Sequence, residues 1–202
     1  ALAANAGETS LLYRYGTDQP LVSALSFKDR AVRYTAAIAI GQAGPNSEFV
    51  GSKKIVENLA EAITDAGLQD LGREMTDSYA TRAIQSLLYL AETRNKIVDL
   101  TAAQEALIHA TKDPRAHIQT FAGQVLSHLP SPDAQRAVAA MGLLESNTPE
   151  VRIAAFHSLA VSAKQNANLL TDEQIQGLYS LVESGKVEAK LRLAAASAYG
   201  AL

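Results

Sequence analysis

The chain has 202 residues, of which 48% are hydrophobic and 19% charged, and its formal net charge at pH 7 is −3. This length can bury a sizeable core, whereas the slightly acidic balance argues against nucleic-acid binding, which needs a basic face. The absence of cysteine excludes disulfides and thiolate metal sites. The longest strongly apolar stretch, near 137–144, is far too short to span a membrane.

Apolar residues recur at helical spacing along most of the chain, and turn signals separate the segments. Residues 1–18 are expected to form an N-terminal segment, the remnant of a preceding repeat. We expect a single repeat domain over 19–202, a fragment of a longer chain, that consists of five helical pairs. The expected helices lie near 20–25, 30–42, 55–66, 77–93, 101–111, 115–129, 131–146, from 149 onward, 171–184 and 187–202.

Five segments share a short pattern, in which an apolar residue precedes Arg or Gln and small or apolar residues follow one and two helical turns later. The patterns begin at Val32, Thr81, Ile118, Val151 and Leu191, which are 49, 37, 33 and 40 residues apart. A period of this size is typical of stacked helical repeats. No single pair could bury both of its apolar faces, so stacking is the expected solution. We expect Val32, Ile118, Val151 and Leu191 to be buried between helices.

The segment Asp29-Arg30-Ala31-Val32-Arg33, followed by Ala36-Ala37, is the strongest example of the pattern. Residues 147–159 and 186–199 repeat it well, whereas Gln119 replaces the arginine and Thr81 the apolar residue. In these features residues 19–202 resemble HEAT repeats, particularly the short repeats of the phycobilin-lyase-like group. The resemblance implies an all-α fold, a right-handed α-solenoid of the HEAT-like superhelical type.

Asp29 and the recurring arginines are interpreted as structural repeat positions; these arginines are Arg33, Arg82, Arg152 and Arg192. A ladder of arginines could bind an acidic partner. The resemblance to HEAT repeats instead favours pairing of each arginine with an acid or a carbonyl nearby, for example Asp29 or Glu150.

Residue patterns that would support catalysis or cofactor binding are not found. His109, Asp113 and His117 have metal-ligand spacing on a helix, but Pro114 separates them onto different helices. The sequence contains no Gly-x-Ser-x-Gly motif and no glycine-rich phosphate loop. We therefore predict a non-enzyme without metal, cofactor, nucleic-acid or membrane binding.

The predicted function is that of a non-catalytic scaffold that binds another protein or a neighbouring domain of its own chain. The alternative is a HEAT-like enzyme or a chromophore-handling protein of the lyase-like group. Candidate partner-binding residues lie in two places. Arg73 and Met75 belong to a loop expected over 68–76, and Leu193 and Leu202 are expected on the open side of the last helix, where a weak homodimer could also form.

Overall fold

A computed structural model describes residues 19–64 and 72–202, and no strand occurs in these ranges. The expected all-α class is confirmed, and the helices follow one another as pairs. In chain order they are α2 (Pro20–Ala24), α3 (Arg30–Ala43), α4 (Ser52–Thr64), α5 (Arg73–Glu92), the 3₁₀ helix η2 (Leu100–Ala103), α6 (Gln104–Ala110), α7 (Ala116–Leu126), α8 (Pro132–Leu143), α9 (Pro149–Asn166), α10 (Asp172–Glu183) and α11 (Ala189–Tyr199). Residues 1–18 lie outside the described ranges.

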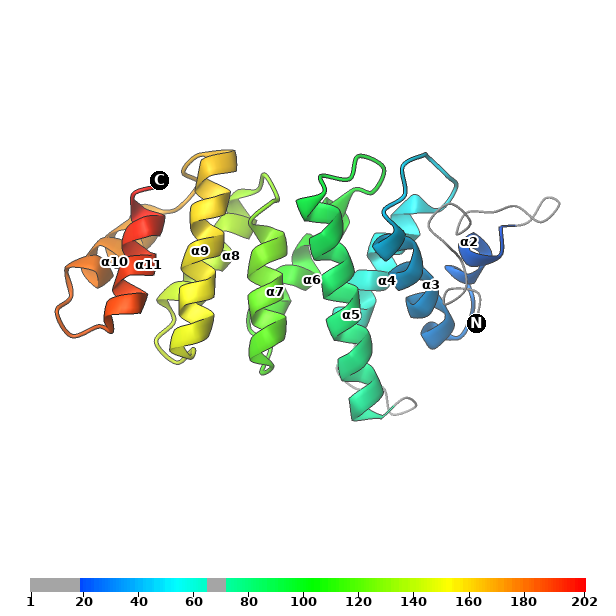
Figure 1. The fold of residues 1–202 in the computed structure, drawn as a ribbon, viewed down its shortest axis with the longest axis horizontal. Helices are drawn as coiled ribbons and strands as arrows, with labels where there is room; N and C mark the ends of the chain where they lie inside the picture. The colour runs from blue at the N-terminus through cyan, green and yellow to red at the C-terminus, as the bar shows by residue number, and fades with distance from the viewer. Residues whose placement is uncertain (1–18, 65–71) are drawn as a thin grey trace. The chain divides into compact units, whose positions relative to one another are not determined.

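The chain divides into two compact units, one up to residue 106 and one over 107–202. In the first unit, α3, α4 and α5 pack against one another, as the adjacent ribbons in Figure 1 show. Gly41 of α3 lies where the three helices meet, because a β-carbon there would contact Leu59 of α4 and Ser86 of α5 at 3.5 and 3.3 Å. The ring of the fully buried Tyr34 meets that of Tyr79 edge-on, with 5.7 Å between ring centroids.

The second unit is organised around α9, which packs against α7, α8 and α11. Figure 1 shows α9 and α11 side by side, with α8 and α10 behind them. Small side chains on α9 and α11 allow this close approach, and Ala155 and Ala195 are both fully buried. Phe156 fills the space between α9 and α8. The second unit is therefore a stack of helical pairs, as the repeat pattern predicts.

Most helix starts in the second unit are capped by local hydrogen bonds that the sequence indicates. The Thr148 hydroxyl accepts from the backbone N–H of Val151, and Pro149 follows it in the first turn of α9. Thr171 and Gln174 form a reciprocal capping box at the start of α10. In the first unit the Asp29 carboxylate caps α3 by the same physics.

Three expectations about local structure are wrong. Helix α5 begins at Arg73 and not at Asp77, so Arg73 and Met75 lie in its first turn. Residues 68–71 of the expected loop lie outside the described ranges. Val32 is 40% exposed, because α2 is short and covers little of the first turn of α3. Helix α11 ends at Tyr199, so Leu202 is not on its face. Ile118, Val151 and Leu191 are buried as predicted.

Candidate partner-binding surfaces

Arg33, the first arginine of the repeat pattern, makes hydrogen bonds with all three of its side-chain nitrogens. Arg33 donates from Nε to Asn58 Oδ1 at 2.9 Å and from Nη2 to both carboxylate oxygens of Glu61 at 2.8 and 2.9 Å. Its Nη1 donates to the carbonyls of Phe27 and Lys28 at 3.2 and 3.3 Å. Both Asn58 and Glu61 belong to α4, the helix after α3. The guanidinium is thus neutralised by a bidentate pair inside the protein.

The corresponding arginine of α9, Arg152, has a different environment. It is half-buried, and its Nε donates to the Gly142 carbonyl of α8 at 2.9 Å. No ion pair joins it to an acid in the described part of the chain. Asp29 and Glu150 are the acid partners expected from the sequence for the repeat arginines, and both examples are wrong. Asp29 caps α3, and Glu150 does not bond to Arg152. The more general expectation, a nearby acid or carbonyl, is confirmed for Arg33 and Arg152.

Arg152 lies in a groove of about 770 Å³ within the second unit, formed by α8, α10 and the start of α9. Two arginines and two exposed glutamates provide its charges, Arg136, Arg152, Glu145 and Glu173. Its apolar lining consists of Ala140, Leu143, Leu144, Leu181 and Val187. Leu144 is 49% exposed there. A groove lined by both apolar and charged side chains has the mixed composition of protein-binding sites.

Hydrogen bonds to the α9–α10 connection fix one wall of this groove. Arg136 Nε donates to the Leu169 carbonyl at 3.0 Å, and Gln174 Nε2 donates to the Arg136 carbonyl at 2.9 Å. The fully buried Gln135 accepts from the Leu169 N–H at 2.7 Å and donates to the Ala167 carbonyl at 3.0 Å. The groove is therefore largely preformed.

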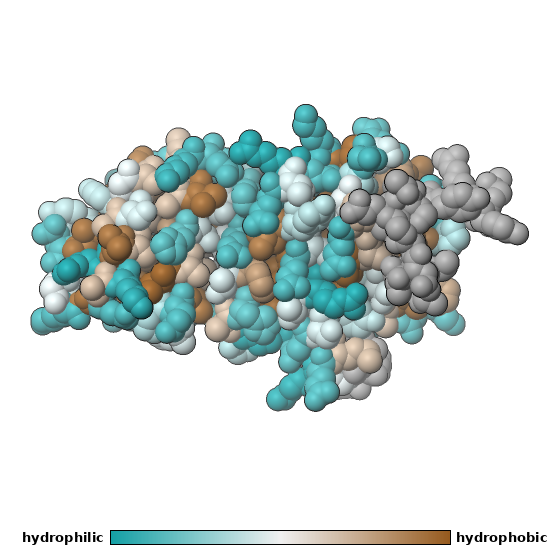
Figure 2. Space-filling model, viewed as in Figure 1, coloured by the Kyte–Doolittle hydropathy of each residue, from teal (hydrophilic) through white to brown (hydrophobic). Residues whose placement is uncertain are grey.

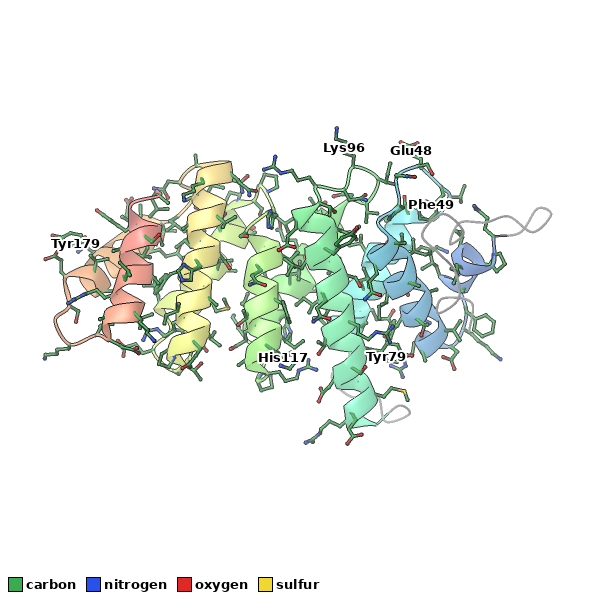
Figure 3. The ribbon with its side chains drawn as sticks, viewed as in Figure 1. Glu48, Phe49, Tyr79, Lys96, His117 and Tyr179 are labelled. Atoms are coloured by element: carbon green, nitrogen blue, oxygen red, sulfur yellow. The ribbon has the colours of Figure 1, made fainter. Side chains whose placement is uncertain are left out.

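A second candidate surface is the outer face of the α10–α11 pair, here called the α11 face and consisting of Tyr179, Leu193 and Tyr199. Leu193 is 72% exposed, as its place off the apolar stripe predicts, and the two tyrosines are 44% and 40% exposed. Their rings lie 6.0 Å apart between centroids. Hydrophobic surface is visible over this pair in Figure 2, and Figure 3 shows Tyr179 projecting outward from α10.

The remaining predicted positions do not join these two surfaces. Arg73 and Met75 are exposed in the first turn of α5, in the other unit. Leu202 is half-buried beyond the end of α11. Arg82 and Arg192 are exposed.

Asp113 lies between His109 and His117, the spacing that resembles a set of metal ligands, and it forms an ion pair with Arg115. Arg115 Nη2 donates to Asp113 Oδ2 at 2.7 Å, and its Nε to Oδ1 at 2.8 Å. Burial raises the pKa of Asp113, but the side-chain and backbone hydrogen bonds from Arg115, with the coulombic effects of Arg115 and His117, outweigh this effect, and the pKa lies below its ordinary value. Within 19–64 and 72–202, no group of three or more potential ligands is arranged to hold a metal ion.

Comparison with known proteins identifies the fold alone. No protein-family model matches the chain, and no curated protein does. Among solved structures, a designed armadillo repeat protein matches with 18% identity and a TM-score of 0.52, over 100% of this chain and 89% of that one. Two engineered proteins match over 90% of this chain, with 22% and 21% identity and TM-scores of 0.51 and 0.52. The chain spans 77% of the first and 46% of the second.

These likenesses place the chain, by fold, in the class of armadillo-like helical repeat proteins. In the described ranges, no helix has both the length and the apolar character needed to cross a lipid bilayer.

Proposed function

We propose that this protein is a non-catalytic helical-repeat scaffold of the HEAT type, which binds another protein or a neighbouring domain of its own chain. The observation that carries the proposal is the exposure of large apolar side chains on the α11 face. Leu193 of α11 is 72% exposed. The residue at the equivalent repeat position of α9, Ile153, is half-buried. Exposed apolar surface on a rigid repeat is typical of a protein interface.

Equivalent positions of α9 and α11 support this assignment. Leu159 in α9 is fully buried within the stack, where α9 packs against α7, α8 and α11, whereas the equivalent Tyr199 is 40% exposed. A polypeptide that docks on the α11 face would cover Tyr199 as the stack covers Leu159. Aromatic residues are also enriched at protein interfaces.

Sedimentation of the 202-residue chain over a concentration series tests whether the α11 face also binds a second copy. A weak dimer that Leu193→Glu abolishes would show that the α11 face binds a second copy of the chain. Leu202→Glu serves as the comparison, because Leu202 lies beyond the helix and is half-buried. If Leu202→Glu abolishes the dimer and Leu193→Glu does not, the dimer interface lies outside the α11 face.

The groove volume of about 770 Å³ supports the alternative, a HEAT-like enzyme or a chromophore-handling protein, since small-molecule sites have similar volumes. An absorbance scan and metal analysis of the protein purified from its native source separate the two functions. Under the scaffold proposal, the protein is colourless and contains no stoichiometric metal. Visible absorbance or stoichiometric metal would favour the alternative.

A further inference from the structure

Two residues that line the groove of the second unit have the same sequence separation from Arg152 as the partners of Arg33 have from Arg33. The two α4 residues that bind Arg33 follow it by 25 and 28 residues. The same separations from Arg152 lead to Gly177 and Ser180 of α10, and both residues line the groove beside Arg152. In the second unit a glycine thus replaces the amide of Asn58, and a serine replaces the carboxylate of Glu61.

This replacement leaves Arg152 without the acid partner that Arg33 has. A β-carbon built on Gly177 would approach the Leu143 side chain at 3.4 Å, so α8 and α10 are close at this point. The Ser180 side chain is exposed and too short to reproduce the bidentate pair that Glu61 makes. Arg152 is oriented by its Nε bond to the Gly142 carbonyl, and its terminal nitrogens have no carboxylate partner among the described residues. A half-buried guanidinium is screened less by solvent than an exposed one and attracts an anion accordingly.

From this comparison we propose that the groove binds an acidic side chain of a partner protein, whose carboxylate pairs with Arg152 as Glu61 pairs with Arg33. Planar carboxylates match the guanidinium fork in a bidentate manner. The apolar lining, including the half-exposed Leu144, receives aliphatic residues on either side of that acid. The exposed Glu145 and Glu173 at the rim repel a longer acidic run. The ligand is therefore a single acid between aliphatic residues.

This inference rests on the proposed scaffold function and names the chemistry of its partner. The probe is a terminally blocked, fluorescein-labelled peptide with the sequence Gly-Ser-Leu-Glu-Leu-Ser-Gly, and its control has Gln in place of Glu. Fluorescence polarisation measures affinity, and amide chemical shifts of the isotope-labelled chain locate binding. We expect saturable binding with shifts around 140–145 and 174–187, and an affinity about tenfold or more lower for the Gln peptide. No binding at about 1 mM peptide, or equal binding of both peptides, would overturn the proposal.

The variant Ser180→Glu provides an internal test, since it places a carboxylate in the groove at the sequence separation from Arg152 that Glu61 has from Arg33. We expect it to occupy Arg152, raise the unfolding temperature and reduce peptide affinity about tenfold or more. Gln176→Glu is the matched control, because Gln176 is exposed on the same helix and does not line the groove. The proposal fails if the two variants have the same unfolding temperature and peptide affinity. Binding through Leu193 of the α11 face would be unaffected by that result. The experiment can therefore reject peptide binding in the groove without rejecting the scaffold function.

Discussion

Replacement of Gly142 by alanine should destabilise the second unit through a steric clash with Phe156. An added β-carbon would lie 2.6 Å from Phe156 Cε1 and 2.9 Å from Cδ1, whereas carbon atoms in favourable contact are about 3.5–4.0 Å apart. The Phe156 ring is fully buried, so it cannot move aside into solvent. Overpacking costs about 1–3 kcal/mol, and the better helix propensity of alanine recovers about 1 kcal/mol at most.

Gly123→Ala is the matched control. Its β-carbon would meet Met141 Cε at 2.7 Å, but this methyl group ends a flexible side chain that can turn aside. Thermal unfolding followed by circular dichroism should show a midpoint lowered by about 2–8 °C for Gly142→Ala, and one unchanged or slightly raised for Gly123→Ala. Adding Phe156→Leu to Gly142→Ala should cost less than the sum of the single changes. Equal stability of Gly142→Ala and wild type would refute the packing argument.

Three further changes test the polar contacts. Gln135→Leu should lower the free energy of unfolding by about 1–3 kcal/mol, because the Leu169 N–H loses its partner; a smaller loss in urea unfolding would mean that water replaces the glutamine. Asn58→Ala should cost a similar amount in the same assay by removing the acceptor of Arg33 Nε, and a neutral effect would contradict this. Asp113 has a pKa below its ordinary value of 3.8, so its stabilising contribution is complete above that pH and is lost as the pH falls through the lower, folded-state pKa. The stability advantage of wild type over Asp113→Asn should therefore shrink as the pH falls below 3.8, and an advantage independent of pH would contradict the ion pair.

Helix starts were predictable where the sequence contains a local capping signal. Thr148-Pro149 and Thr171-Asp172 mark α9 and α10 correctly, because a cap depends only on residues within one turn. Helix α5 has no such signal, since Gly72 precedes it with a φ of 73° and no side-chain cap. Asp77 resembles a cap in sequence but lies inside the helix. A local capping signal therefore does not mark the start of α5.

The candidate surfaces were only partly predictable. Exposure of Leu193 follows from helix periodicity, which places it off the apolar stripe. The groove could not be predicted from periodicity. The missing acid partner of Arg152 is recognised only once the residues of α4 that pair with Arg33 of α3 are known. Once those partners are known, Gly177 and Ser180 can be read directly from the sequence. The unpaired charge of Arg152 is thus a tertiary property that becomes visible through comparison of repeats.

Site-specific photo-crosslinking in cells of the native source tests the scaffold function most directly. A photoreactive phenylalanine analogue replaces Leu193 of the α11 face in one variant and the exposed Gln176 in the control. We expect a discrete protein adduct from position 193 that the control does not give, because a partner covers the α11 face. Absence of any adduct at position 193, or identical adducts from both positions, would contradict the proposal that this protein holds a partner there.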